Sequence, residues 1–306
     1  MSPLRLVPVR AFFTGTSRFV RTACRLGVTA ALTGSAFCLC FLPGSQAIAQ
    51  TVYRIGVVPQ FEPAKLFGVW RPILNDLERR TGMKFDLVGQ PAISAFEKAF
   101  AAGQFDFAYM NPFHALVAHE QQGYEPLVRD ANQLLKGILV VRKDSPINEV
   151  SALRGTTIAF PSPNALGASL LMRADLSRVH QINYKPVYVL THTSVYLNVA
   201  LGVAAAGGGV KRTLDEQPDE VKDQLRVLYT TREIKPHPVV VHPRVPAEHR
   251  VLVRDAFIAM GKSDEGQRLL ENIPMKSMAP ATLNDYLPLR SWGLKDFYVQ
   301  PLKAKE

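Results

Sequence analysis

Residues 53–81 read YRIGVVPQFEPAKLFGVWRPILNDLERRT and contain the pattern that decides the fold. The apolar run at 53–58 is short and predicts a buried strand, and a loop with two prolines follows it. Residues 64–81 have apolar side chains at helical spacing, which predicts a helix with one buried face. That face is expected to consist of Phe67, Trp70, Ile73, Leu74 and Leu77. Gly82 is the expected C-cap of this helix.

The same alternation of short apolar runs and helical patterns continues along the chain. Further strands are expected at residues 85–88, 105–109, 136–142, 156–160, 185–190, 204–206, 225–230 and 239–242. Further helices are expected at residues 92–102, 150–155, 165–179, 191–201, 247–260 and 264–271, with another that opens at Asn111-Pro112-Phe113. Strands separated by helices are typical of α/β proteins with mostly parallel sheets. We expect two such lobes, residues 50–142 with 239–306 and residues 143–238, joined by hinge strands near 136–142 and 239–242.

The first 49 residues have the pattern of a secretory signal peptide. Residues 1–25 contain five arginines and no acidic residue, an apolar stretch follows at 26–42, and Ala47-Ile48-Ala49 is a typical cleavage site. The alternative is an uncleaved membrane anchor, but the apolar stretch is shorter than the ~20 residues that a membrane span needs. We therefore predict cleavage near Ala49 and a location outside the cytoplasm.

Removal of the signal peptide changes what the composition allows. All three cysteines, Cys24, Cys38 and Cys40, fall within it, so the mature chain has no thiol for a disulfide or a metal site. Five arginines are lost with it, and the formal net charge falls from +10 to +5. A mildly basic chain without a long Lys/Arg run is not typical of nucleic-acid-binding proteins but suits a small anionic ligand. We expect no cofactor and no metal, because the histidines show no good metal-ligand spacing.

Candidate binding residues follow the ends of the predicted strands, where open α/β sheets bind their ligands. Several of them precede helices, whose free N–H groups and dipole favour an anion. The full set consists of Gln60, Phe61, Tyr109, Asn111, Ser162, Asn164, His192, Thr193, Ser194 and His237. The strongest segment is Thr191-His192-Thr193-Ser194, with three hydroxyls and an imidazole at a helix start. The other interpretation of this segment is a helix N-cap with no ligand.

Four segments of the mature chain together resemble a known protein family. They are Arg54–Pro59 (RIGVVP), Gly103–Tyr109 (GQFDFAY), Leu153–Phe160 (LRGTTIAF), and His192–Tyr196 with Ala206-Gly207-Gly208. In order and spacing they resemble the phosphate/phosphite/phosphonate-binding proteins of ABC transporters, over nearly all of the mature chain. The resemblance implies a type II periplasmic-binding-protein fold, in which two lobes joined by two hinge strands close on a tetrahedral oxyanion. It also implies delivery to a membrane permease; the alternative is a protein that reports to a sensor kinase. In either role we expect a monomer.

The resemblance assigns roles to several of the candidates. Tyr109 matches the family's ligand-facing tyrosine, and His192 matches the histidine that opens a helix of the second lobe. Gln60 and Phe61 lie where the first lobe makes an early contact. The turn at 162–164, which contributes Ser162 and Asn164, matches the turn that cradles the phosphate group.

The chain departs from the family pattern at two places. Ala165-Leu166-Gly167-Ala168 replaces a run of serines and threonines, so several hydroxyl donors are missing and Ser169 is the next hydroxyl. This difference predicts a ligand other than simple phosphonate. Gly209-Val210-Lys211-Arg212 and His237 stand where binders of aminophosphonates have acidic residues, which argues against an amine on the ligand. Arg212 is either an anion contact or a solvated helix start, and His237 is either a ligand contact or structural.

A secreted enzyme is the remote alternative. The mature chain has no G-x-S-x-G elbow, no H-E-x-x-H motif and no cysteine nucleophile. Because catalysis needs an activated nucleophile or a metal centre, we predict a binding protein and not an enzyme.

Overall fold

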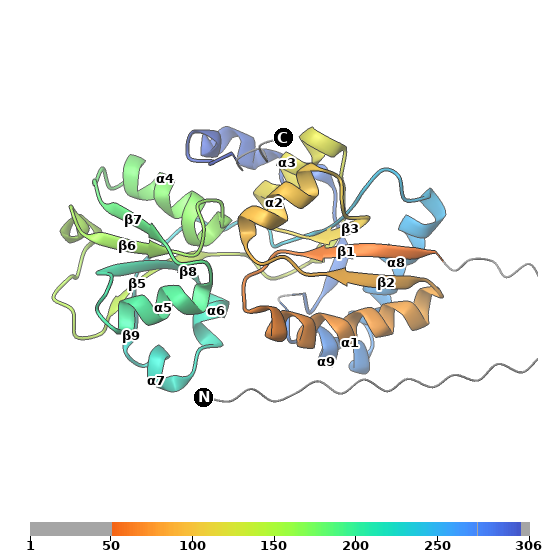
Figure 1. The fold of residues 1–306 in the computed structure, drawn as a ribbon, viewed down its shortest axis with the longest axis horizontal. Helices are drawn as coiled ribbons and strands as arrows, with labels where there is room; N and C mark the ends of the chain where they lie inside the picture. Colours follow the sequence, from red (N-terminus) through yellow and green to blue (C-terminus); the bar gives the residue numbers. More distant parts are fainter. Residues whose placement is uncertain (1–50, 274, 301–306) are drawn as a thin grey trace, which may run out of the picture. The chain divides into compact units, whose positions relative to one another are not determined.

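The computed structural model describes residues 51–273 and 275–300, so the predicted signal peptide lies outside the described residues. Within this part of the chain, helices flank two mixed sheets (Figure 1), which confirms the predicted α/β class. None of the helices found there is both long enough and apolar enough to cross a membrane.

The first sheet has the strand order β11-β4-β10-β3-β1-β2. β1 pairs in parallel with β2 and β3, whereas β10 runs antiparallel between β3 and β4. Its strands are β1 (Val52–Val57), β2 (Lys84–Val88), β3 (Phe107–Tyr109), β4 (Glu125–Asp130), β10 (Val239–Val241) and β11 (Met278–Pro280). Its helices are α1 (Pro63–Thr81), α2 (Ile93–Ala101), α3 (Pro112–Gln122), α8 (Ala247–Met260) and α9 (Asp264–Leu270). The sequence did not predict β4, which contains a proline and three charged residues, or the three-residue β11.

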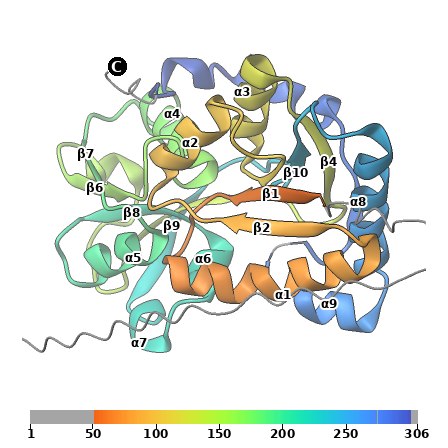
Figure 2. The same ribbon diagram turned by 45° about the vertical axis from the view of Figure 1, so that its right-hand side comes forward.

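Helix α1 shows how the sequence pattern becomes packing. Trp70, Ile73 and Leu77 are buried against the first sheet as predicted, and Gly82 adopts the left-handed conformation of a C-cap at φ 70°. The prediction was wrong for Phe67, which is 40% exposed, because its ring lies beside Gly89 at the edge of the sheet. In Figure 2, α1 and α9 lie below this sheet and α2 and α3 lie above it.

The second sheet has the strand order β7-β6-β8-β5-β9. β6 pairs in parallel with β7 and β8, and β5 runs antiparallel between β8 and β9. The predicted lobe boundary at residue 142 puts β5 in the first lobe, whereas its pairing puts it in the second sheet. The strands are β5 (Gly137–Arg142), β6 (Thr157–Phe160), β7 (Lys185–Tyr188), β8 (Ala206–Val210) and β9 (Leu225–Thr230). The helical segments are η1 (Val150–Leu153), η2 (Leu166–Leu170), α4 (Leu171–Arg178), α5 (His192–Ala200), α6 (Lys211–Asp215) and α7 (Asp219–Lys222).

Strand β5 is apolar along its length because both of its faces are covered. Side chains alternate between the faces of a strand, so Ile138 and Val140 join the cluster around α5, whereas Leu139 and Val141 join the cluster around α4. A continuous apolar run is therefore the expected pattern for this strand.

The glycines of β8 let helical segments approach the second sheet closely. Residues 207–209 lie inside this strand, although the sequence predicted that the strand ends before them. A Cβ atom on Gly208 would collide with the carbonyl oxygen of Ala168 in η2, and one on Gly209 would collide with the hydroxyl of Tyr196 in α5. η2 is a π turn that begins the predicted helix at 165–179. The glycines thus set the position of the segment that replaces the family's hydroxyl run.

After β11 the chain forms three short 3-10 helices that contact both lobes. They are η3 (Leu283–Asp285), η4 (Leu287–Trp292) and η5 (Leu294–Asp296). Tyr286 and Leu289 pack in one cluster with Phe113 of α3 and Leu171 of α4. Beyond η5, Arg173 of α4 donates to the carbonyl oxygen of Phe297. The sequence predicted none of these helices.

Candidate functional site

A cavity of about 240 Å³ lies between the two sheets. Its wall comes from the loop after β1, from the two segments that cross between the sheets, and from the end of β8 with the start of α6. The lining residues are Gln60, Phe61, Gln133, Leu134, Leu135, Lys136, Val210, Lys211, Arg212, Thr213, Pro236 and His237. Apolar side chains form much of this wall, and it contains no carboxylate.

A smaller pocket of about 20 Å³ adjoins this cavity. The two share Gln60, Leu135, Val210 and His237. The smaller pocket, which we call the inner pocket, is lined by Val58, Gln60, Ile93, Asn111, Leu135, Ala165, Leu166, Gly167, Ala168, His192, Val210 and His237. It too lacks a carboxylate in its lining. The structure therefore brings Gln60, Asn111, His192 and His237 together, four residues that the sequence predicted as ligand contacts.

His192 is the first residue of α5 and is almost fully buried. Its Nδ1 atom lies 3.2 Å from the hydroxyl oxygen of Thr213, and that hydroxyl donates to the carbonyl oxygen of Val210. If the Thr213 proton is used in this way, the matching tautomer of His192 has its proton on Nδ1 and donates it to Thr213. Burial lowers the pKa of His192 to about 4, so the ring is neutral near pH 7.

His237 lies in the second crossing segment, between two prolines, and is 6% exposed. Its ring stacks on Tyr109 with the ring centroids 5.3 Å apart and forms no hydrogen bond with another described residue. Burial and the nearby His114 and His192 lower the pKa of His237 to about 3. Both imidazoles that line the inner pocket are therefore uncharged before any ligand binds.

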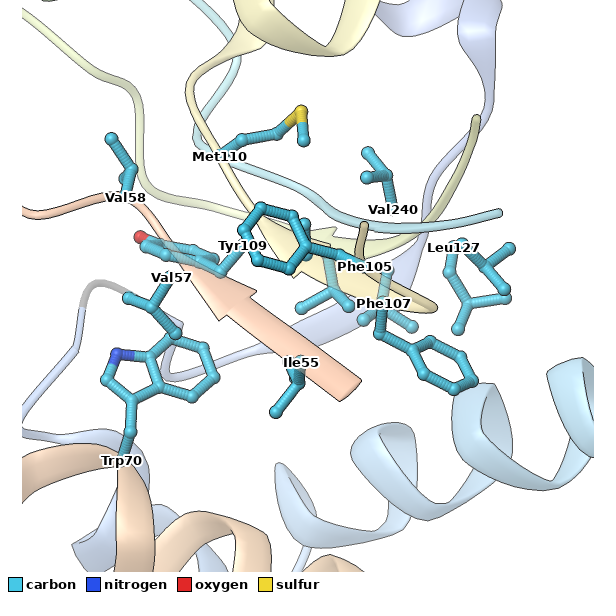
Figure 3. Close-up of a cluster of buried hydrophobic side chains, with 14 of the residues drawn as sticks. Ile55, Val57, Val58, Trp70, Phe105, Phe107, Tyr109, Met110, Leu127 and Val240 are labelled. Atoms are coloured by element: carbon cyan, nitrogen blue, oxygen red, sulfur yellow. The ribbon is translucent and has the colours of Figure 1, made fainter. Parts of the chain in front are cut away.

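Tyr109 ends β3 and lies beneath the pocket wall. Its ring is held between His237 and Trp70, whose centroid lies 5.1 Å away, and burial raises its pKa. In Figure 3 its hydroxyl points away from Phe107 and toward the Val58 end of β1. This buried hydroxyl has no hydrogen-bond partner within residues 51–273 and 275–300. It is thus an unused donor beside the loop that carries Gln60.

The segment that replaces the family's hydroxyl run forms one wall of the inner pocket. Residues 165–168 line it with apolar side chains, as the sequence indicates. However, Leu166, Gly167 and Ala168 are the first residues of η2, and N–H groups in a first helical turn have no partner within the helix. These backbone groups supply donors that the missing hydroxyls do not. The Ser169 hydroxyl is buried without a partner among the described residues and is absent from the linings of both cavities.

Asn164 lines neither cavity and instead forms hydrogen bonds between distant segments of the chain. Its side-chain amide donates to Glu97 and to the carbonyl oxygen of Val299, both at 2.7 Å. Its backbone carbonyl oxygen accepts a 3.2 Å bond from the Asn111 side chain. Glu97 also contacts the His114 ring at 2.9 Å. This buried network joins the first lobe to the second. It uses both hydrogens of the Asn164 side-chain amide, so neither is free for a ligand.

Ser162, Thr193 and Ser194 also lie outside the linings of these two cavities. The Ser194 backbone N–H and hydroxyl contact the Thr191 side chain at 3.1 and 3.0 Å, which is the N-cap of α5 that the sequence left open as an alternative. Phe61 lines the larger cavity, with the Lys65 ammonium 3.9 Å above its ring.

Arg212 lines the larger cavity at the start of α6, and it already has partners of its own. It forms an ion pair with Glu216 at 2.8 Å and donates a 2.7 Å bond to the carbonyl oxygen of Glu271 at the end of α9. Glu216 in turn pairs with Lys65 of α1 at 2.9 Å. We call these four residues the latch, because they join the lobes beside the larger cavity.

Sequence reasoning missed the apolar wall of the larger cavity. Leu134 and Leu135 follow β4, a strand that was not predicted, and so no strand end pointed to them. Thr213 was missed because it lies in the first turn of α6, where its role depends on contact with His192. The described residues contain no group of three or more side chains that could hold a metal ion.

Comparisons with known proteins agree with this geometry. Residues 55–286 match the model of a family described as "ABC transporter, phosphonate, periplasmic substrate-binding protein". The chain is 21% identical to the phosphonates-binding periplasmic protein of Escherichia coli, over 79% of this chain and 75% of that protein.

Two solved structures have the same fold. One is the binding protein component of an ABC phosphonate transporter from Pseudomonas aeruginosa, with a TM-score of 0.72 and 18% identity, covering 79% of this chain and 85% of the other. The second is PhnD1 from Prochlorococcus marinus in complex with methylphosphonate, with a TM-score of 0.72 and 16% identity, covering 80% of this chain and 97% of the other. The fold is therefore that of the type II periplasmic binding proteins, as predicted.

Proposed function

Because the chain belongs to the periplasmic substrate-binding proteins of ABC phosphonate transporters, we propose that it captures a small tetrahedral oxyanion and delivers it to a membrane permease. Phosphonate, phosphite and phosphate are the candidate head groups. The family consists of binding proteins and not of enzymes, and it works in the periplasm. The observation that carries the proposal is the convergence of Asn111, His192 and His237 on one small pocket at the start of a helical segment.

The head group is held in the inner pocket by hydrogen bonds. The first-turn N–H groups of η2 and the Asn111 amide donate two kinds of them, the His192 ring donates another once it is protonated, and the helix start favours negative charge. The lobes close about the two crossing segments, and the ligand stabilises the closed state, in which the protein acts as a monomer. Signal-peptide cleavage near Ala49 would release the protein into the periplasm.

Anion binding beside two neutral histidines should change the number of protons that the protein holds. In the tautomer whose Nδ1 donates to Thr213, the Nε2 atom has no proton to give to an anion until the ring gains a second one. A nearby anion also favours the charged ring. We expect the protein to take up protons when it binds methylphosphonate at pH 7. Calorimetry in buffers of different ionisation enthalpy measures this uptake, and an identical heat in every buffer would contradict it.

The decisive test is calorimetric titration of the purified protein with phosphate, phosphite and methylphosphonate. His192→Ala is expected to weaken binding by about 1–3 kcal/mol, the range for a charge-assisted hydrogen bond. His180→Ala is the matched control, because His180 lies in the same lobe but lines neither cavity. Absence of binding to all three anions would refute the proposed function.

Deletion of the gene should abolish growth on the bound anion as the sole source of phosphorus; normal growth would argue against delivery to a permease.

A further inference from the structure

After β11 the chain joins the two lobes a third time. It passes through η3, η4 and η5, and in Figure 1 this segment lies between α3 of the first lobe and α4 of the second. The two crossing segments already connect the lobes. A third connection matters for hinge motion, because it must either bend at some point or limit the motion.

The start of this C-terminal segment is fixed to the first lobe. The backbone N–H of Ala281 donates to the carbonyl oxygen of Leu127 in β4 at 3.1 Å. Asp285 forms a 2.9 Å ion pair with Arg129 of the same strand, and the two side chains are only 17% and 13% exposed. An ion pair that is shielded in this way is screened less by salt than a surface pair. The chain up to η3 therefore belongs with the first sheet.

The end of the C-terminal segment is fixed to the second lobe. The Asn164 side chain binds both backbone groups of Val299, at 2.7 and 2.9 Å, much as a neighbouring strand would. Arg178 of α4 donates to the carbonyl oxygen of Trp292 at 3.0 Å and forms an ion pair with Asp296. Hydrogen bonds contribute about 0.5–1.5 kcal/mol each, and more where one partner is charged. The second lobe thus holds this part of the chain at both of its ends.

The same part of the chain contacts the first lobe less firmly. Arg290 and Lys295 pair with Glu120 of α3 at 3.1 and 3.7 Å, and these side chains are 37–67% exposed. Exposed ion pairs contribute about 0–1 kcal/mol. Tyr298 packs against Phe113 with the ring centroids 5.4 Å apart. A ring contact tolerates a shift of its partner better than a hydrogen bond does, because a hydrogen bond weakens steeply with angle.

We propose that η4 is a third hinge and that residues 292–299 move as part of the second lobe. This inference rests on the lobe closure proposed above and adds a pivot to the two crossing segments. η4 lies between the two sets of anchors, and a 3-10 helix has poorer hydrogen-bond geometry than an α-helix, so it bends more easily. Leu294 packs in one cluster with Leu166 and Leu170 of η2. The second lobe therefore carries the segment and the η2 wall of the inner pocket together.

Pairs of spin labels report which lobe the segment follows. Residues 50–306 contain no cysteine, so labels attach only to introduced ones. Leu252→Cys in α8 marks the first lobe, Leu201→Cys after α5 marks the second, and Gln300→Cys marks the segment; all three side chains are exposed. Double electron–electron resonance measures the three distances in the free protein and with methylphosphonate. We expect the 300–201 distance to be narrow and constant, and the 300–252 distance to shift with the 201–252 distance.

A matched pair of arginines tests the anchor itself. Arg178→Ala removes the polar bonds of this side chain to the C-terminal segment. Arg142 is the control, because it forms an ion pair of similar exposure with Asp144 and donates to the carbonyl oxygen of Ala200 within the second lobe. Arg178→Ala should widen the 300–201 distance distribution about twofold, because the segment then opens locally. Arg142→Ala should leave that distribution unchanged.

The outcomes separate this inference from the proposed function. If the 300–201 distance changes with methylphosphonate, or if both arginine variants leave it narrow, the inference is overturned. If all three distances are narrow and unaffected by methylphosphonate, the lobes do not move, and lobe closure and the third hinge fall together. The capture of an oxyanion is decided separately by the calorimetric titration.

Discussion

The side-chain amide of Asn111 donates a hydrogen bond across the two lobes to the carbonyl oxygen of Asn164, at 3.2 Å. The other end of the same side chain accepts from the backbone N–H of His114 at 2.8 Å and so caps α3. One residue of the inner pocket thus stabilises a helix in the first lobe and a contact with the second. These two roles can be separated by substitution.

Asn111→Ser keeps a side-chain oxygen for the cap but removes the donor to Asn164, whereas Asn111→Ala removes both. We expect both variants to bind methylphosphonate at least tenfold more weakly, because the Asn164 carbonyl oxygen is then unpaired in the closed state. Only Asn111→Ala should also lose about 1 kcal/mol of unfolding free energy through the missing cap. Urea unfolding and calorimetry measure the two effects. Equal stability of the two variants would argue against the capping role.

The latch is expected to have only a small effect, because its side chains are partly exposed. Lys65 is 42% exposed and Glu216 is 24% exposed, and ion pairs of this kind contribute about 0–1 kcal/mol. Lys65→Ala should speed ligand dissociation less than about fivefold, and the difference should disappear in high salt. Lys222→Ala, which breaks an ion pair with Asp219 inside the second lobe, is the control and should leave dissociation unchanged. Stopped-flow measurements at two salt concentrations test this; an effect that salt does not reduce would contradict it.

The two buried histidines predict how stability depends on pH. In the unfolded chain a histidine has a pKa near 6.5, whereas in the folded protein His192 and His237 have pKa values of about 4 and about 3. Between these values the unfolded state binds more protons, so stability falls as the pH is lowered below about 6.5. Each group contributes up to about 1.4 kcal/mol per pH unit.

The range from pH 6.5 to pH 5 isolates this effect, since most carboxylates titrate below it. In urea unfolding, the slope of stability against pH should be smaller in His192→Gln than in the unmodified protein. An equal slope in the two proteins would show that His192 is not held neutral by burial.

The glycines of β8 are expected to be intolerant of any side chain. Gly208→Ala places a methyl group against the Ala168 carbonyl oxygen and the ring of Phe160, so we expect a loss of several kcal/mol or a failure to fold. Gly68→Ala in α1 is the control, because an added methyl group there would meet no atom within 4 Å outside its own helix backbone, and alanine favours a helix by about 1 kcal/mol. Thermal unfolding should therefore move in opposite directions for the two variants. A Gly208→Ala protein of normal stability would contradict the close packing of η2 on β8.

The main strands and helices were predictable because their hydrophobic periodicity is local. Helix α8 was predicted at the residues where it occurs, and β5 was recognised from an apolar run whose two faces are both buried. β4 was not recognised, because its proline and charged residues carry no strand pattern and its pairing with β10 is decided by the tertiary structure. For the same reason the sequence did not show that the glycines of residues 207–209 form a strand.

The candidate site was predictable where a polar residue follows a strand. Gln60, Asn111, His192 and His237 were found in this way, and they line the inner pocket. The role of Asn164 was not predictable, since its partners Glu97 and Val299 are far away in the sequence. Burial of both imidazoles, and hence their neutral state, also depends on packing between segments that the sequence pattern treats separately.

The order of strands in the first sheet has a consequence for how the protein folds. β10 lies between β3 and β4, although the whole second sheet, residues 137–230, separates it from them in the chain. Pairing across so long a loop is slow because its closure is entropically costly. The second sheet is contiguous in the chain, and its β5 pairs with β8 and β9 across a shorter separation, so we expect it to form first. The ligand cleft is then complete only when β10 pairs with β3 and β4. Pulse-labelling hydrogen exchange would detect early protection in β5 and β6 and late protection in β3; simultaneous protection would contradict this order.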